Sequence, residues 1–332
     1  MKRITELDGS VKFISHSAVG GYEERRGPLG EKFDFCDDTN KFGQKTWELA
    51  EAEMGRISLN ISLSKAGLSH EDIEIAVAGD LQNQCVSSCL GLADFGIPYL
   101  GVYGACSTCT ESIMILSSFM TSNKDIKYGA AITTSHNSAA ERQFRMPIEY
   151  GGQRTPTSQW TATAAGSFIL GREGKTSVKE YMVGKIVDGS TSDGSNMGAA
   201  MSFAAADTIL SYFAETSYPN SHFDYIVTGD LGKVGSSLLK DILKEERPGL
   251  ENFHTDCGML LYDFENQDAH SGSSGCGTSA SVLSTYFLPK LDSGEFKRIL
   301  FLSTGALMSP SSLLQGENIY GIAPLIFLES NT

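Results

Sequence analysis

The chain has 332 residues, of which 41% are hydrophobic, so it can bury a large core and is too long for one ordinary domain. Acidic residues outnumber basic ones by 40 to 26, which argues against nucleic acid or an anionic lipid surface as a general partner. Seven scattered cysteines favour reduced thiols, and the chain shows neither a secretory signal nor an apolar run of about 18 residues, so we expect a soluble protein made in the cytosol.

Strands and helices alternate in the first half of the chain, which is typical of an α/β protein. A helical pattern runs from Gln44 to Ala66 and ends at Gly67, and a buried strand then leads to Asp80. The segment from Arg142 to Trp160 reads as a long loop. Three more strands are predicted at residues 99–104, 128–136 and 164–171.

The second half contains five further apolar segments that we interpret as strands. They lie at residues 179–190, 224–230, 258–264, 298–305 and 323–329.

Three short segments of the first half recur in the same order in the second. "IAVAGDL" at 75–81 matches "YIVTGDL" at 225–231, "GACSTCTES" matches "GCGTSASVL", and "AAITTSHNS" matches "LFLSTGALMS". The shared order indicates a duplicated βα unit. We therefore predict two halves, residues 1–172 and 173–332.

Each of the matched cysteine turns opens a helix with almost no charge. Glu111 is the only charged residue between Ser107 and Thr121, and none lies between Thr278 and Leu288. A helix without a polar face is buried on all sides. Two such helices between two sheets predict an α-β-α-β-α layering.

These features resemble the thiolase-like superfamily over nearly the whole chain. "AGLSHEDIEIAVAGD", "YGACSTCTES" and "GCGTSAS" are similar to the corresponding segments of ketoacyl synthase III condensing enzymes. More narrowly, "GACSTCTESIMILSSFM" resembles a sporulation branch of this superfamily, which belongs to the machinery that moves dipicolinic acid into the developing spore. The resemblance implies a five-layer α/β fold of two duplicated βαβ-type halves.

In condensing enzymes the cysteine of this turn attacks an acyl thioester, assisted by a histidine and an asparagine. Cys106 falls at the cysteine position, whereas the histidine and asparagine positions are occupied by Gly229 and Gly277. Without those donors we expect no catalysis. His254 or His270 could replace the histidine, so an acyltransferase or condensing enzyme using Cys106 remains the alternative.

The two glycines are expected to enlarge the cavity beside Cys106 and so convert an enzyme site into a receptor site. Dipicolinate, pyridine-2,6-dicarboxylate, is a flat dianion that requires room for a ring, hydrogen-bond donors and positive charge. Helix N-termini can supply donors, and basic side chains after the strand at 128–136 can supply charge. The predicted ligand-binding residues are Cys106, His136, Arg142, Arg145, Gly229, Gly277, Thr278 and Met308, with Arg154 a little further on.

Several of these residues have a simpler structural interpretation. Cys106 could be a small buried thiol, His136 a satisfied core histidine, and the arginines solvated surface charge. The pair Cys106 and Cys109 has Cys-x-x-Cys spacing, but a structural zinc site needs about four ligands, and packing is favoured for Cys109. We expect no metal and no cofactor.

The resemblance also implies partners and a location. It implies dipicolinic acid as ligand, alone or as its calcium chelate, in uptake during sporulation and in release during germination. It further implies integral membrane subunits of the same transport system, which would hold the chain peripherally on the inner membrane of the forespore. A homodimer formed beside the cysteine turn is expected, because thiolase folds commonly pair there.

Overall fold

The computed structural model describes residues 3–144 and 154–332. Its main feature is a large twisted sheet whose strands follow the order β12-β11-β14-β17-β9-β2-β8-β6-β4-β5. These strands are β12 (His254–Asp256), β11 (Tyr225–Thr228), β14 (Arg298–Leu302), β17 (Leu325–Ser330), β9 (Thr176–Met182), β2 (Lys12–Gly20), β8 (Ala164–Gly171), β6 (Gly129–Ser135), β4 (Ile75–Gly79) and β5 (Tyr99–Gly101), with β1 (Ile4–Glu6) beside β9 and β3 (Phe35–Cys36) beside β2.

The two ends of this sheet have the same topology. Read inward from either edge, the first two strand pairs are parallel and the next two are antiparallel, in β5-β4-β6-β8-β2 and equally in β12-β11-β14-β17-β9. The halves join where Lys12 and Phe13 of β2 pair with Ser177 and Thr176 of β9. The duplicated arrangement is therefore present, while the division at residue 172 stays a prediction.

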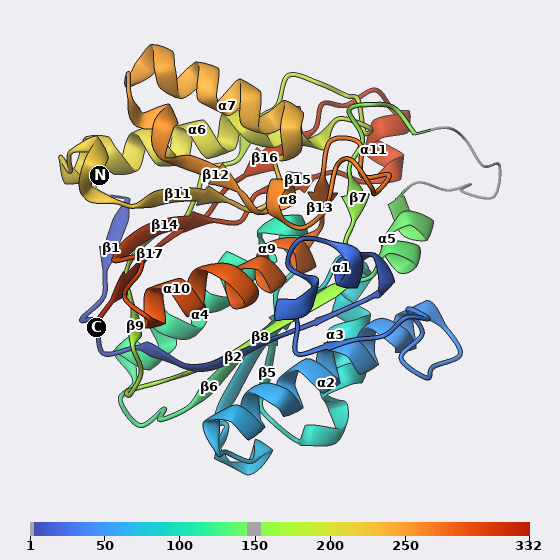
Figure 1. Ribbon diagram of the computed structural model, residues 1–332, viewed down its shortest axis with the longest axis vertical. Helices are drawn as coiled ribbons and strands as arrows, with labels where there is room; N and C mark the ends of the chain where they lie inside the picture. Colours follow the sequence, from blue (N-terminus) through green and yellow to red (C-terminus); the bar gives the residue numbers. More distant parts are fainter. Residues whose placement is uncertain (1–2, 145–153) are drawn as a thin grey trace.

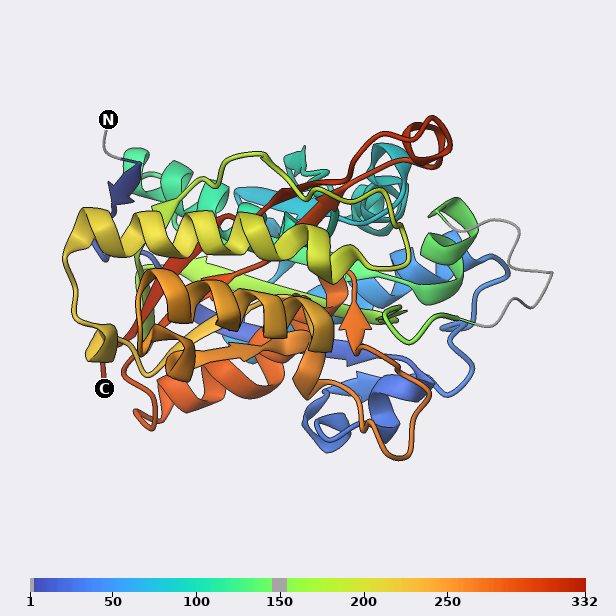
Figure 2. The same cartoon turned by 90° about the horizontal axis from the view of Figure 1, so that it is seen from above.

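Helices cover both halves and also fill the space between them, which gives five layers (Figure 1). The outer layers are α2 and α3 on one side and α6 and α7 on the other, and α6 and α7 lie side by side (Figure 2). The helices are α1 (Tyr22–Arg26), α2 (Trp47–Ala66), α3 (Val86–Leu92), α4 (Thr108–Ser122), α5 (Asn137–Phe144), α6 (Met197–Thr216), α7 (Gly232–Glu246), α8 (Cys257–Leu260), α9 (Cys276–Val282), α10 (Leu288–Asp292) and α11 (Pro310–Leu314).

The central helices are α4 and the continuous run of α9 and α10. All seven residues of α9 are buried, as predicted, whereas α4 leaves Phe119 40% exposed near its C-terminal end. Residues 283–287 form a π turn between α9 and α10. Pro289 follows it, and because proline lacks an N–H and crowds the carbonyl four residues earlier, the wider turn accommodates it.

Most of the predicted elements are confirmed. The predicted helix at 44–66 is α2, although it begins at Trp47, because the Thr46 side chain caps it by accepting from the N–H of Leu49. It ends at Gly67, whose φ of 69° suits a residue without a side chain. The predicted strands ending at Asp80 and starting near residues 99, 128, 164, 224, 298 and 323 are β4, β5, β6, β8, β11, β14 and β17.

The strand predicted at 258–264 is wrong, because the chain forms α8 there. The preceding strand ends at Asp256, whose carboxylate accepts from the N–H groups of Leu231 and Gly232. A Cβ on Gly258 would lie 2.6 Å from the Ser273 carbonyl oxygen, so the chain turns close to its neighbour. Leu261 is fully buried, so the apolar run belongs to the core without being a strand.

Three other boundaries differ from the prediction. The strand predicted at 179–190 is two strands, β9 and β10 (Val187–Asp188), and the predicted loop at 142–160 begins inside α5 and ends in β7 (Trp160–Thr161). Strand β2 was not predicted. Small strands complete the fold as a ladder of β10, β16 (Tyr320–Ile322) and β15 (Gly305–Leu307), and a ribbon of β7 and β13 (Ser273–Ser274).

Candidate functional site

The cysteine turn lies between β5 and α4, in the middle layer of the fold. Ala105 has a φ of 54°, in the left-handed region that residues with a side chain rarely adopt. This sharp turn places Cys106, only 6% exposed, directly before the first turn of α4. The geometry thus retains a strained turn that presents one cysteine at the start of a buried helix.

The Cys106 thiol interacts electrostatically with the carboxyl group of Asp230, which follows Gly229 after β11. Asp230 is itself held on several sides: its Oδ1 accepts from Thr304 Oγ1 at 2.8 Å, and its Oδ2 accepts from the Gly275 N–H at 2.9 Å and from Ser274 Oγ at 3.3 Å. Asp230 is 1% exposed. The second half of the chain therefore places a carboxyl group, rather than a histidine, against the thiol.

The electrostatics of this pair oppose thiolate formation. Burial raises the pKa of Cys106 well above its ordinary value, and the charge of Asp230 raises that pKa further. Burial raises the pKa of Asp230 to about 6. Near neutral pH the aspartate is therefore mostly ionised and the thiol stays protonated, the reverse of an activated cysteine.

Cys106 lines a small cavity that continues outward as a groove. The inner cavity has a volume of about 50 Å³ and the adjoining groove about 350 Å³. Both are walled mainly by apolar side chains, and no basic residue of the described chain lines either one. The residues common to both are Leu81, Ala105, Phe144, Ala306 and Met308.

Cys106 and Met308 are thus the two predicted ligand residues that the structure brings to this cavity. The expectation that Gly229 and Gly277 leave space beside Cys106 is wrong. A Cβ on Gly277 would lie 2.2 Å from the Ala164 carbonyl oxygen, and one on Gly229 would lie 3.0 Å from Ser303 Cα. Both glycines allow neighbouring backbone segments to pack closely, and neither leaves an empty space beside Cys106.

Thr278 and His136 also lie away from the cavity. Thr278 is fully buried and donates to the Ser274 carbonyl oxygen at 2.8 Å. The His136 Nε2 donates to the Asn40 carbonyl oxygen at 2.8 Å, and the ring packs against Trp47 with 5.2 Å between ring centroids. Side chains alternate across a strand, so Ser135 faces α9 and His136 faces the opposite side.

The predicted positive charge does not converge on the cavity among the described residues. Burial lowers the pKa of His136 to about 4, so this ring is neutral. Arg142 lies on α5 and pairs with Glu48. Arg154 pairs with Asp268 at 2.9 Å, and Arg145 lies outside the described residues.

The proposed substitutes for the missing histidine are engaged elsewhere. His254 Nε2 lies 2.8 Å from Thr228 Oγ1, and burial lowers the pKa of His254 to about 3. His270 pairs with Asp268 at 2.7 Å. No hydrogen bond or ion pair links either ring to Cys106 among the described residues.

Cys109 packs in the core one helical turn after Cys106. It is fully buried beside Ser279 and Ser303, and burial raises its pKa to about 12. Within residues 3–144 and 154–332, no group of three or more histidine, cysteine, aspartate or glutamate side chains is placed to hold a metal ion. No described helix is both long and apolar enough to cross a bilayer.

Sequence reasoning missed Asp230, a buried charged residue that interacts with Cys106. A signal was present, because the repeated "GDL" places an aspartate after the glycine in both halves. Its counterpart Asp80 is also buried and accepts from the N–H and Oγ of Ser88. Glu141 and Phe144 on α5 were missed as well, because no helix was predicted there.

Comparisons with known proteins agree with this architecture. A sequence model of the family described as Stage V sporulation protein AD matches residues 1–329. Stage V sporulation protein AD of Bacillus subtilis is 39% identical over 316 residues, which cover 95% of this chain and 93% of that protein.

Solved structures with a similar fold include thiolase-like condensing enzymes. OleA of Xanthomonas campestris, in the structure of one of its single-substitution variants, superposes with a TM-score of 0.61 at 12% identity, over 98% of this chain and 99% of the other. The 3-oxoacyl-[acyl-carrier-protein] synthase III of Aquifex aeolicus gives 0.58 at 13% identity, over 96% and 99%. At these identities the likeness shows the thiolase-like fold that the sequence predicted.

Proposed function

The chain belongs to the Stage V sporulation protein AD family, and we propose that within sporulation it is a non-catalytic binding subunit for dipicolinic acid. The subunit would serve the spore's dipicolinate transport machinery in uptake during sporulation and in release during germination. The ligand could arrive alone or as its calcium chelate. Family membership supports the sporulation role, and the site supports the absence of catalysis.

The observation that carries the non-catalytic proposal is the contact between Cys106 and Asp230. A condensing enzyme needs a thiolate and neutral or cationic donors that stabilise negative charge in the transition state. Here a carboxylate faces the thiol, and the histidine and asparagine positions are Gly229 and Gly277. An additional negative charge at this point disfavours both the thiolate and an oxyanion.

We place the ligand in the Cys106 cavity and in the groove that leads past Met308. The inner cavity alone is small, but the groove falls within the volume range of small-molecule sites. Asp230 is buried behind the cavity wall formed by Cys106 and Ser274, so its charge repels a carboxylate in the cavity and its protonation removes that repulsion. Because the pKa of Asp230 is about 6, binding in this cavity should strengthen as the pH falls from about 7.5 to 5.5.

The alternative function, a cysteine-dependent acyltransferase or condensing enzyme, is favoured by one feature. The left-handed Ala105 turn and the helix that starts after Cys106 are retained, and such strain is common at active sites. Incubation with acyl-CoA followed by intact-mass measurement separates the two functions. The binding subunit gives no acyl adduct, whereas the enzyme gives an adduct that maps to Cys106.

Membrane attachment of the protein would run through integral membrane partners.

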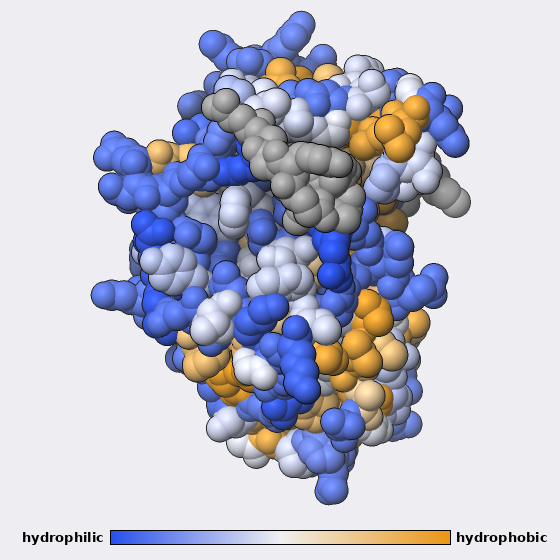
Figure 3. Space-filling view, turned by 90° about the vertical axis from the view of Figure 1, so that its right-hand side faces the viewer, coloured by the Kyte–Doolittle hydropathy of each residue, from blue (hydrophilic) through white to orange (hydrophobic). Residues whose placement is uncertain are grey.

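A second copy of the chain would pair with the first at β5. This strand is an edge of the large sheet, and all three of its residues are exposed. Large apolar side chains on and near it are exposed, namely Val86, Leu90, Tyr99, Leu100, Tyr103 and Phe119. The face shown in Figure 3 is mostly polar, and its apolar surface lies in separate patches, among them patches on the right-hand side and across the lower part.

Calorimetric titration tests the proposed ligand directly. Pyridine-2,6-dicarboxylate should bind, while pyridine-2-carboxylate and pyridine-3,5-dicarboxylate should bind at least about tenfold more weakly, because they lack one carboxylate or its placement. Equal binding of all three would reduce the interaction to nonspecific attraction of anions and would overturn the proposal.

A further inference from the structure

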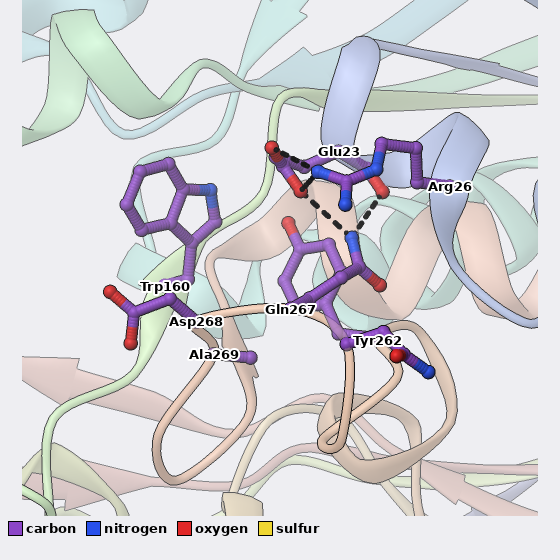
Figure 4. A pocket seen from close by; sticks show the side chains of 8 residues that line it. Glu23, Arg26, Trp160, Tyr262, Gln267, Asp268 and Ala269 are labelled. Carbon is purple, nitrogen blue, oxygen red and sulfur yellow. Dashed lines mark hydrogen bonds and ion pairs between the residues drawn. The ribbon is translucent and has the colours of Figure 1, made fainter.

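A separate cavity of about 350 Å³ lies between α1, Trp160 and the segment 262–269 (Figure 4). We propose that this cavity is a second binding site, which takes a planar aromatic carboxylate. The inference rests on the ligand chemistry of the proposed function, but not on the Cys106 cavity. The residues that carry it are Trp160, Tyr262, Arg26 and the polar side chains around them.

The ribbon of β7 and β13 separates the two cavities. Trp160 and Thr161 are successive residues of β7, so their side chains point to opposite faces. Trp160 lines the second cavity, while Thr161 and its pairing partner Ser274 line the cavity at Cys106. A ligand stacked on Trp160 therefore lies on the other side of the ribbon from Cys106.

Two aromatic rings that are held by other groups form walls of the cavity. The guanidinium of Arg154 lies 4.9 Å from the centroid of the Trp160 ring and is itself fixed by Asp268. Tyr262 is 2% exposed, and its hydroxyl donates to the buried carboxyl of Glu24. Rings fixed in this way lose little conformational freedom when a flat ring packs against them.

Arg26 supplies a guanidinium at the rim, opposite Trp160 in Figure 4. Only its Nη1 has a hydrogen-bond partner among the described residues, the carboxylate of Glu23, which also accepts from Gln267 Nε2 at 2.9 Å. The Arg26 side chain is 44% exposed, so its remaining N–H groups can meet a carboxylate.

The remaining charges limit the class of ligand. Glu23 and Asp268 also line the cavity, and each is paired with an arginine, Arg26 and Arg154 respectively. Two carboxylates beside one accessible guanidinium disfavour a polyphosphate. A cationic ligand would have to displace an arginine that is already paired. A planar aromatic ring that carries a carboxylate fits both the aromatic walls of the cavity and its one accessible guanidinium.

The chain offers a sharp optical test because it has two tryptophans, Trp47 and Trp160. In Trp47→Phe, tryptophan fluorescence reports on Trp160 alone. Titration with pyridine-2,6-dicarboxylate, corrected for ligand absorption, should quench this emission in a saturable way. Arg26→Gln in the same background should weaken the quenching affinity by about tenfold or more, because a charge-assisted hydrogen bond is lost.

Arg25→Gln is the matched control. Arg25 lies on the same helix, but it pairs with Asp38 and donates to the Cys36 carbonyl oxygen, away from the cavity. It should change the affinity less than about twofold. Ala306→Leu, which fills the Cys106 cavity and its groove, should leave the Trp160 quenching unchanged. Circular dichroism and thermal melts confirm that each variant is folded.

Calorimetry on the wild-type chain separates failure of this site from failure of the proposed function. If calorimetry detects binding but the Trp160 emission does not change, the second site is overturned while dipicolinate binding stands. The same holds if Arg26→Gln and Arg25→Gln bind with equal affinity. Loss of the Trp160 response in folded Ala306→Leu would place the ligand at Cys106 and also overturn it. No heat and no quenching would overturn both.

Discussion

The thiol of Cys106 lies beside the buried carboxyl group of Asp230, and burial together with the charge of Asp230 raises the pKa of the thiol. The two residues come from different halves of the chain and meet in the middle layer of the fold. The pair accounts for a cysteine that stays protonated although a strained turn places it at the start of a buried helix.

The first prediction concerns the reactivity of Cys106. At about pH 7.5, iodoacetamide should modify the exposed Cys89 and leave Cys106 unmodified, because thiolate is the reactive form and burial also blocks access. Asp230→Asn removes the negative charge and should speed alkylation of Cys106 by about tenfold. Peptide mass mapping over time measures both sites, and Cys89 serves as the internal control. Rapid labelling of Cys106 in the wild type would contradict the assignment.

The second prediction is that Cys106→Ser folds and keeps most of its dipicolinate binding. Serine is similar in size to cysteine and keeps a polar hydrogen beside Asp230, while it removes thiol chemistry. Calorimetric titration should give an affinity within about threefold of the wild type, since roughly 0.6 kcal/mol or less is lost. A complete loss of binding in the folded variant would mean that the thiol itself takes part.

The third prediction concerns Gly277, where added atoms meet backbone. Gly277→Ala should destabilise the fold by about 1–3 kcal/mol or more, because its Cβ would collide with the Ala164 carbonyl oxygen. Gly229→Ala is the milder comparison, with nearest atoms at 3.0–3.4 Å. Urea unfolding followed by circular dichroism measures both. An unchanged midpoint for Gly277→Ala would show that α9 can move away from β8.

The fourth prediction is that stability falls as the pH rises from about 6.5 to 8. Burial raises the pKa of Glu24 to about 7, of Asp256 to about 7 and of Glu51 to about 8. The folded state therefore holds protons that the unfolded chain has already lost, so stability decreases through this window by up to about 2 kcal/mol per carboxyl.

Buried histidines act in a different part of the pH range. The lowered pKa values of His16, His136 and His254 remove stability only as the pH falls below about 6.5, so they do not mask the carboxyls above it. Thermal melts across the window measure the trend, and Glu51→Gln, which cannot lose a proton, should flatten it. A melting temperature that rises between pH 6.5 and 8 would disprove this account.

The fifth prediction is that Leu100→Asp weakens self-association. Leu100 lies on β5 and is 38% exposed, so a charge there would be buried by a second copy that pairs with this edge. Sedimentation velocity should show a dimer for the wild type and a monomer for the variant. Leu49→Asp is the control, because Leu49 is equally exposed at 39% but lies on α2. If both variants are monomers, or if both remain dimers, the interface lies elsewhere.

The sequence by itself determined the alternation of strands and helices, the two buried central helices and the repeated order of strands. These are properties of local composition: α9 has no polar face, and the "GDL" motif closes a strand in both halves. The sequence also indicated the ends of elements where a local signal existed, as with Gly67, which directly follows α2. An apolar run such as residues 258–264 is compatible with a strand and with a buried turn, so composition alone could not distinguish the two.

The surroundings of Cys106 were decided only by the tertiary structure. Alignment of short motifs indicated which residues lack a side chain, but not what packs against them, so Gly277 was expected to open space that the Ala164 backbone fills. The direction of His136 depended on which face of β6 meets α9. Asp230 became a partner of the thiol because two strand ends from opposite halves of the chain converge on one helix start, and a contact of that kind has no signature in either segment alone.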